Sequence, residues 1–247
     1  MSIKLDQPAV LSNELCEKHQ MQKVLLGSFT ICRACADELL TQTQIQHAHE
    51  VNCMVRDKHF AGAQLPKRHA QSGFRDYIVQ NDGQKNAKAE CVRYVKDFKS
   101  AVYRNLVMVG RTGTGKTHLA CAVARNILGD QKYARYVTSA DMAQEIANAW
   151  SKDVADNEAN AIYRFVDLDL LILDEYGLHD RHESHLQLIH KVLYARYDAN
   201  KPTMLISNLT AQDLAQDLGD RLWSRLQHDE LVVIECNWHD QRVGGAA

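Results

Sequence analysis

The chain has 247 residues, of which 45% are hydrophobic and 24% are charged, a composition that is typical of a globular protein and excludes a disordered tail protein, a collagen-like chain and a coiled coil. The formal net charge of 29 − 31 = −2 predicts no general affinity for nucleic acid. No run of about 18 uncharged apolar residues is present and the N-terminus lacks the pattern of a signal peptide, so we expect a cytoplasmic protein with no membrane span.

Three of the seven cysteines lie close together near the N-terminus. Because no export signal precedes them, they indicate a metal site rather than a disulfide scaffold. Cys16 and His19 form one pair of ligands and Cys32 and Cys35 form a second, and two residues separate the members of each pair. Residues 23–31, between the pairs, predict a β-hairpin. Three thiolates and one imidazole complete a tetrahedron with no open position, so the pattern predicts a structural zinc site.

The alternative to this zinc site is a set of free thiols beside an unrelated histidine. His47, His49 and Cys53 are the spare ligands if His19 does not bind the metal. A segment this small has no core of its own, so metal binding would have to fold it, with about 10–16 kcal/mol as in comparable zinc peptides. The remaining cysteines are scattered, and we expect them to pack in the interior.

A polar stretch over residues 36–60 predicts a helix, and the texture of the sequence changes at residues 61–68. We place a domain boundary there, with residues 1–64 as a zinc-binding module and helical linker and residues 65–247 as a second domain. In the second domain, short apolar runs alternate with helical patterns, which predicts an α/β fold with a five-stranded parallel sheet covered on both faces. The predicted strands are 105–109, 133–138, 168–173, 202–207 and 231–236, and the predicted helices are 116–128, 140–150 and 184–197.

The segment Gly110-Arg111-Thr112-Gly113-Thr114-Gly115-Lys116-Thr117 follows the first of these strands and opens a helix. It matches the pattern G-x-x-x-x-G-K-[ST] in full and predicts a phosphate-binding loop for ATP. Its glycines let successive N–H groups form a nest for anions, and the following helix adds its positive N-terminal end. Lys116 would bridge the β- and γ-phosphates, and the Thr117 hydroxyl would bind Mg²⁺. The alternative is a glycine-rich turn that matches by chance.

The most apolar predicted strand ends in Asp174 and Glu175. The carboxyl end of a buried parallel strand lies beside the nucleotide in such folds, so Asp174 would hold Mg²⁺ through its water shell. Glu175 would act as a general base on the attacking water, although it could also be a solvated carboxylate that merely follows the strand. Because a kinase does not need such a base, the pair favours hydrolysis of ATP over transfer to a small molecule.

Polar residues also follow the next strand and a short helix near the C-terminus. Asn208 ends the strand and could hold the attacking water, although an asparagine there is often a turn former or a helix cap. Arg221 and Arg225 are four residues apart and share one helix face. They are either solvated or directed at the γ-phosphate of a neighbouring subunit, where a guanidinium can be worth about 10³–10⁵ in rate. The second possibility predicts self-association through the ATPase domain.

Residues from about Leu65 to the end resemble the AAA+ ATPases of the DnaC/IstB-like group, the bacterial and phage helicase loaders and their transposition relatives. The resemblance covers about three quarters of the chain. It implies an AAA+ P-loop core. The chain departs from many AAA+ proteins because it stops soon after the fifth predicted strand, so we expect it to lack their C-terminal helical lid, with Arg242 as a possible substitute. The residues that carry it are the phosphate loop, Leu170-Leu171-Ile172-Leu173-Asp174-Glu175, Ile206-Ser207-Asn208, residues 218–225, Leu65-Pro66-Lys67-Arg68 with Phe74 and Tyr77, and Cys236-Asn237-Trp238.

The resemblance also implies roles for residues, cofactors and partners. ATP, Mg²⁺ and Zn²⁺ would be the cofactors, and the zinc module would grip a DnaB-like replicative helicase during initiation of DNA replication. In relatives, an added helix at the position of residues 151–165 lines a channel for single-stranded DNA. Because this segment is acidic here, the remaining candidate DNA contacts are Lys152, Tyr163 and Arg164. The site residues implied are Lys116, Thr117, Asp174, Glu175, Asn208 and Arg221, with Arg225 as a second candidate for the arginine finger.

Two other functions remain open. A transposition helper of the IstB kind would act on duplex DNA with a transposase, and the predicted metal module argues against it because it adds a docking domain for a protein partner. A small-molecule kinase would need a basic lid and no Glu175.

A further group, His179, His182 and His185, is interpreted as a solvated helix face because no cysteine or carboxylate completes a metal site.

Overall fold

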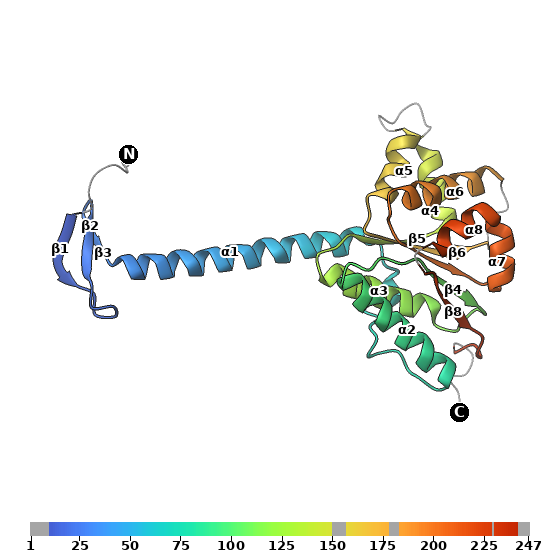
Figure 1. Ribbon diagram of the computed structural model, residues 1–247, viewed down its shortest axis with the longest axis horizontal. Helices are drawn as coiled ribbons and strands as arrows, with labels where there is room; N and C mark the ends of the chain where they lie inside the picture. The colour runs from blue at the N-terminus through green and yellow to red at the C-terminus, as the bar shows by residue number, and fades with distance from the viewer. Residues whose placement is uncertain (1–9, 150–156, 178–182, 229, 242–247) are drawn as a thin grey trace. The chain divides into compact units, whose positions relative to one another are not determined.

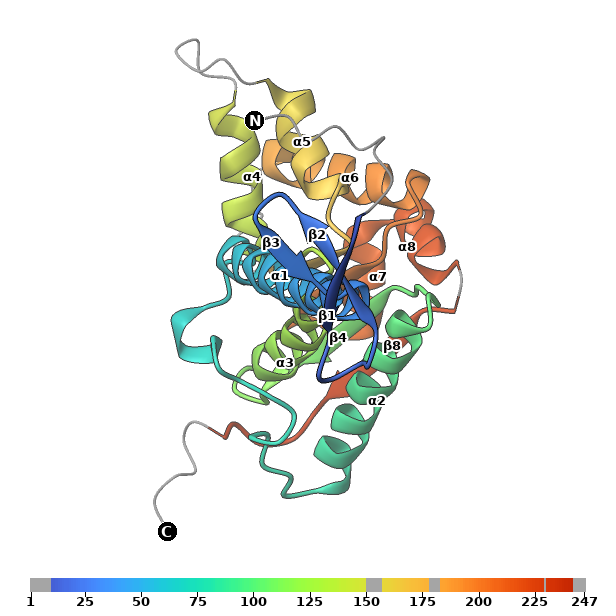
Figure 2. The same ribbon diagram turned by 90° about the vertical axis from the view of Figure 1, so that its left-hand side faces the viewer.

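The computed structural model describes residues 10–149, 157–177, 183–228 and 230–241, and it divides into two compact units between Val55 and Arg56. In the first unit, β1 (Val10–Leu15), β2 (Gln22–Leu26) and β3 (Phe29–Ile31) form an antiparallel sheet in that order (Figure 2). The β2–β3 hairpin turns at Gly27, whose φ of 63° favours glycine, and it confirms the predicted hairpin. β1 was not predicted, because most of its side chains are exposed and no alternation marks it.

The helix α1 (Arg33–Gly62) confirms the helix predicted over the polar stretch. His59 is its only buried residue, and the ring of His59 lies 3.5 Å from that of Tyr133, between centroids. The backbone N–H of Tyr136 donates to the carbonyl of Ala63 at 2.9 Å. These last turns of α1 therefore belong to the second compact unit, which begins at Arg56. In the described part of the chain, no helix is long and apolar enough to cross a membrane.

The second unit contains the five-stranded parallel sheet that the sequence predicts. The strand order is β5-β6-β7-β4-β8, so the strand that carries the phosphate loop lies between the last two strands of the chain. Both faces of the sheet are covered, which explains why the central strands are apolar runs without alternation. The strands are β4 (Leu106–Gly110), β5 (Ala134–Thr138), β6 (Leu170–Tyr176), β7 (Thr203–Ser207) and β8 (Val232–Cys236).

Two hydrophobic cores cover the two faces, with α2 (Asp82–Lys99) and α3 (Lys116–Gly129) on one side (Figure 1). Leu170 and Ile172 of β6 point to this side, and Leu171 and Leu173 point to the other. The helices α2, α5 and α7 were not predicted, and α5 and α7 are short. The helices of the second side are α4 (Ser139–Asn148), α5 (Glu158–Val166), α6 (Glu183–Asp198), α7 (Ala211–Leu218) and α8 (Asp220–Gln227).

Candidate nucleotide site and metal centre

The glycine-rich loop joins the end of β4 to the start of α3 and depends on glycine at three positions. Gly110, Gly113 and Gly115 have φ of 118°, 75° and 88°. A Cβ at Gly110 would lie 2.4 Å from the carbonyl oxygen of Cys236, and one at Gly115 would lie 2.9 Å from the ring of Tyr77. The left-handed backbone and the close neighbours therefore exclude a larger side chain.

Lys116 lies at the N-terminus of α3 and is only 6% exposed. Its Nζ donates to the carbonyls of Gly110 and Arg111, at 2.5 and 2.8 Å, and to the Oδ1 of Asn208 at 2.9 Å. The fold therefore brings together the lysine of the loop and the asparagine at the end of β7, 92 residues apart in sequence. An ammonium group held by oxygen atoms at the loop has the position and charge to bind phosphate oxygens.

The carboxylate of Asp174 is 4% exposed and receives three hydrogen bonds. The Thr117 hydroxyl donates to Oδ2 at 2.9 Å, the Tyr136 hydroxyl donates to the same oxygen at 2.8 Å, and the Glu175 N–H donates to Oδ1 at 2.7 Å. Burial, together with the charge of Asp174, raises the pKa of Tyr136 far above its ordinary value, so Tyr136 is a neutral donor. Tyr136 was not among the predicted site residues, although it lies within a predicted strand.

Glu175 follows directly and adopts the left-handed conformation, with φ of 59°. The pairing of β6 with β7 shifts its register here, between Leu173 and Tyr176. The Ser139 hydroxyl donates to the carbonyl of Glu175 at 3.3 Å, and the Ser207 hydroxyl donates to that of Tyr176 at 2.7 Å. The irregularity exposes the Glu175 side chain while Asp174 stays buried, and a left-handed non-glycine residue costs about 1–3 kcal/mol that its surroundings must offset.

Two segments far apart in sequence hold the middle of the loop. The Tyr77 hydroxyl and the Trp238 Nε1 both donate to the carbonyl of Thr114, at 3.3 and 2.9 Å. The N–H of Gln241 donates to the carbonyl of Gly113 at 3.0 Å. Tyr77 and Trp238 are among the residues that carry the family resemblance, but no contact was predicted for either. Both side chains donate to the same carbonyl, that of Thr114, so both segments contact the phosphate loop.

The two arginines of α8 differ in their surroundings. The Arg225 guanidinium lies 4.7 Å from the ring centroid of Tyr194 and 5.0 Å from that of Tyr197, and its Nη1 lies 3.7 Å from Asp198 Oδ1. Arg221 is exposed and makes no comparable contact with any residue in the described ranges. Both arginines line an open hollow of about 670 Å³. The Arg225 guanidinium therefore contacts side chains of its own chain, whereas Arg221 is exposed.

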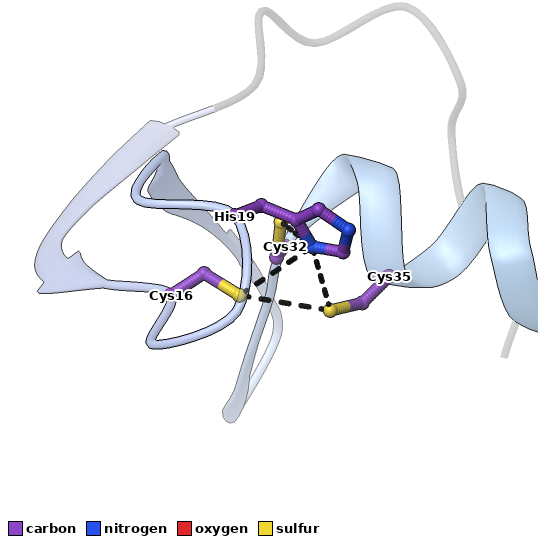
Figure 3. A group of neighbouring side chains, drawn as sticks. All are labelled: Cys16, His19, Cys32 and Cys35. Atoms are coloured by element: carbon purple, nitrogen blue, oxygen red, sulfur yellow. Dashed lines mark hydrogen bonds between the residues drawn. The ribbon is translucent and has the colours of Figure 1, made fainter.

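The four N-terminal ligand candidates come together in the first unit (Figure 3). Their ligand atoms all lie within 4.8 Å of one another. The Nδ1 of His19 lies 3.3 Å from the Cys35 Sγ and 3.7 Å from the Sγ atoms of Cys16 and Cys32. A hydrogen bond from the backbone N–H of His19 lowers the pKa of the Cys16 thiol to about 6, which favours the thiolate that binds metal. Three soft sulfur ligands and an imidazole at this spacing fit a tetrahedral zinc ion.

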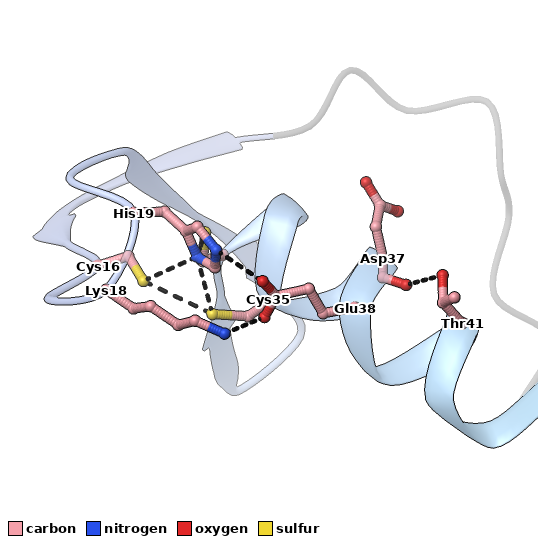
Figure 4. A network of polar contacts seen from close by, with 8 residues as sticks. Cys16, Lys18, His19, Cys35, Asp37, Glu38 and Thr41 are labelled. Carbon is pink, nitrogen blue, oxygen red and sulfur yellow. Dashed lines mark hydrogen bonds and ion pairs between the residues drawn. The ribbon is translucent and has the colours of Figure 1, made fainter. Parts of the chain in front are cut away.

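A carboxylate lies behind the histidine of this cluster (Figure 4). The Oε1 of Glu38 lies 3.1 Å from the Nε2 of His19, and Lys18 forms an ion pair with the same carboxylate. A proton on Nε2 leaves Nδ1 free to face the three thiols, so Glu38 selects the tautomer that a metal ion requires. Glu38 was not among the predicted site residues, although it lies one helical turn after Cys35 on α1.

The other candidate residues lie elsewhere. His49 and Cys53 contact each other on α1, and with His47 they join no cluster of three ligands in the described part of the chain. Tyr163 on α5 is 63% exposed, and Arg164 Nε lies 3.9 Å from Glu145. His185 lies within α6. The candidates Lys152, His179, His182 and Arg242 lie outside the described residues.

Comparison with known proteins gives consistent relatives. The sequence model of the family described as IstB-like ATP binding protein matches residues 37–237. The replicative helicase loader DnaC of Escherichia coli strain K12 is 24% identical over 230 residues, which cover 90% of this chain and 93% of DnaC. Two solved structures share the fold. A crystal structure of the DnaC helicase loader is 23% identical, with a TM-score of 0.60 over 68% of this chain and 99% of that one. The replication initiator DnaA bound to AMPPCP and single-stranded DNA is 24% identical, with a TM-score of 0.57 over 70% and 51%.

The first glycine of the loop provides a test of the geometry. Gly110→Ala places a methyl group against the Cys236 carbonyl on a left-handed backbone, so it is expected to destabilise the fold by about 2–3 kcal/mol. Gly129→Ala is the control, because nothing lies within 4 Å of a Cβ at the end of α3. Thermal unfolding of both variants checks this, and equal midpoints would contradict the described packing of the loop on β8.

Proposed function

Since the chain belongs to the family of IstB-like ATP-binding proteins, we propose that this AAA+ ATPase loads a replicative DNA helicase onto single-stranded DNA. ATP binding and hydrolysis would switch its grip on the helicase and on the DNA. The observation that carries this proposal is the alignment with a replicative helicase loader over nearly the full length of both chains. Because it covers 90% of this chain, that alignment takes in at least part of the N-terminal unit as well as the ATPase unit.

The contacts of the nucleotide site support a division of labour. Lys116 would bind the β- and γ-phosphates, and Thr117 and Asp174 would hold Mg²⁺, which neutralises phosphate charge when bound. Glu175 is exposed at the same strand end and would accept the proton of the attacking water. Asn208, which already contacts Lys116, would orient that water.

The N-terminal cluster supports a structural zinc site that folds the docking module for the helicase. In the described part of the first unit, the buried residues are only Cys16, Val24 and Cys32. Because two of these three are ligand candidates, the sheet has almost no apolar core, and a metal ion would supply the missing stabilisation. Among residues 157–165, Tyr163 is the best candidate for stacking on a DNA base, because its ring is exposed.

The description of the matching family, IstB-like ATP binding protein, favours a second function, that of a transposition helper. A transposition helper would act on duplex DNA with a transposase. The chain should then assemble on duplex DNA and ignore helicases. The N-terminal cluster of Cys16, His19, Cys32 and Cys35 favours a docking module for a protein partner and therefore supports the helicase loader.

Co-purification tests the loader function directly. The full chain, mixed with a purified DnaB-like hexameric helicase and ATP, is expected to form a stable complex visible by size-exclusion chromatography with light scattering. Lys116→Ala is the control for dependence on nucleotide. A chain that binds duplex DNA and a transposase, but no helicase in any nucleotide state, would instead establish the transposition helper.

The different surroundings of the two arginines predict different variants. Arg221→Ala is expected to keep ATP binding but to lose about 10³-fold or more of the hydrolysis that appears on assembly, because it removes a guanidinium acting on a neighbour's γ-phosphate. Arg225→Ala should mainly lower thermal stability, because it removes contacts within its own chain. Steady-state ATPase measurements against protein concentration check both. Loss of turnover in Arg225→Ala alone would reverse the assignment.

The carboxylate behind His19 predicts the strength of metal binding. The full chain is expected to bind about one zinc ion, and Glu38→Ala should weaken zinc affinity about 10–100-fold, because the imidazole loses the partner that orients it. Glu50→Ala, on an exposed part of the same helix, is the matched control. Competition with a chromogenic chelator measures the affinity. A folded N-terminal unit without zinc would refute the metal site, and unchanged affinity in Glu38→Ala would refute the role of Glu38.

A further inference from the structure

We propose that Tyr136 is a positioning residue of the ATP site, which holds the Asp174 carboxylate in place for the Mg²⁺ that accompanies ATP. The proposal rests on the proposed role of Asp174 and adds to it a residue outside the phosphate loop. Tyr136 would not touch the nucleotide. It would act through the carboxylate alone.

The sheet places the two side chains on one face. Tyr136 of β5 pairs with Ile172 of β6, and Asp174 follows Ile172 by two residues. Because side chains alternate along a strand, Tyr136, Ile172 and Asp174 all point to the side that α3 covers. This diagonal relation brings the phenolic hydroxyl within 2.8 Å of the Asp174 Oδ2.

The three donors to Asp174 differ in what else they do. Thr117 belongs to the phosphate loop, and its hydroxyl is the proposed ligand of the metal. The N–H of Glu175 belongs to the strained irregularity at the end of β6. Tyr136 alone comes from a regular strand, is 9% exposed and packs in the core. It is therefore the donor whose position depends least on the nucleotide or on the irregular backbone.

A hydrogen bond from a fixed neutral hydroxyl to a carboxylate is short and strong, and it orients the acceptor. The hydrogen bond from Tyr136 would orient the carboxylate oxygens of Asp174 toward the metal position before ATP binds. Without it, the carboxylate keeps only donors that belong to the loop and the irregularity, and it loses a buried partner. The deficit should appear in the metal requirement of nucleotide binding and not in binding of the nucleotide without metal.

Tyr136→Phe, compared with Tyr94→Phe, tests this. Tyr94 is also a buried tyrosine, 3% exposed, and its hydroxyl donates to the carbonyl of Arg104 at 3.0 Å, so its variant loses a hydrogen-bonded hydroxyl away from the site. Affinity for a fluorescent N-methylanthraniloyl ATP is measured across a Mg²⁺ titration and in EDTA. In Tyr136→Phe the Mg²⁺ midpoint is expected to rise at least about tenfold, the effect of losing one hydrogen bond to a charged group, while the affinity in EDTA stays unchanged. Tyr94→Phe should keep the wild-type midpoint.

A double variant separates positioning from packing. Asp174→Asn should raise the Mg²⁺ midpoint by itself, and adding Tyr136→Phe should raise it little further, because Tyr136 acts through that carboxylate. An unchanged midpoint in Tyr136→Phe, or an equal loss of affinity with and without Mg²⁺, would overturn the proposal. If Lys116→Ala binds the nucleotide as the wild type does, the assignment of the phosphate loop itself fails, which is a different result.

Discussion

The second unit is organised around one buried negative charge, the carboxylate of Asp174. A buried carboxylate must be hydrogen-bonded or paired, and this one receives donors from three separate elements, through Thr117, Tyr136 and the Glu175 N–H. A single side chain therefore links the start of α3, the edge strand β5 and the end of β6, in addition to the pairing of β5 with β6. The parallel sheet makes this possible, because it brings the carboxyl ends of its strands to one edge.

From this carboxylate, hydrogen bonds continue across the strand ends to the phosphate loop. The Ser207 hydroxyl donates a hydrogen bond to the carbonyl of Tyr176. Asn208 follows Ser207 directly, and its side-chain oxygen accepts a hydrogen bond from Lys116. A change in what Lys116 binds thus has a short route to the irregular backbone around Glu175. Two hydrogen bonds hold the left-handed backbone of Glu175: its N–H donates to Asp174, and the Ser139 hydroxyl donates to its carbonyl. Strain maintained in this way is consistent with the proposed role of Glu175 as the general base.

The sequence predicted the parts of this site that are written locally. The loop pattern, the apolar strand that ends in Asp174 and each of the two N-terminal ligand pairs lie within a few residues, so composition and order suffice. Tyr136 and Glu38 were missed because their roles depend on which strand neighbours β6 and on which turn of α1 faces His19. Buried runs revealed the central strands, whereas the exposed β1 and the short helices α5 and α7 carry too little periodicity.

The two units obtain their stability from different sources, and this separation suits a protein with two tasks. The ATPase unit has a large core on each face of its sheet. In its described residues, the first unit buries only Val24 besides the ligand candidates Cys16 and Cys32, while Phe29 is 75% exposed. A metal ion at the proposed site would therefore add most to the stability of the N-terminal sheet, which has little apolar core of its own. The apolar surface left outside that small core is a cost in water, and a partner that covers it would recover the free energy.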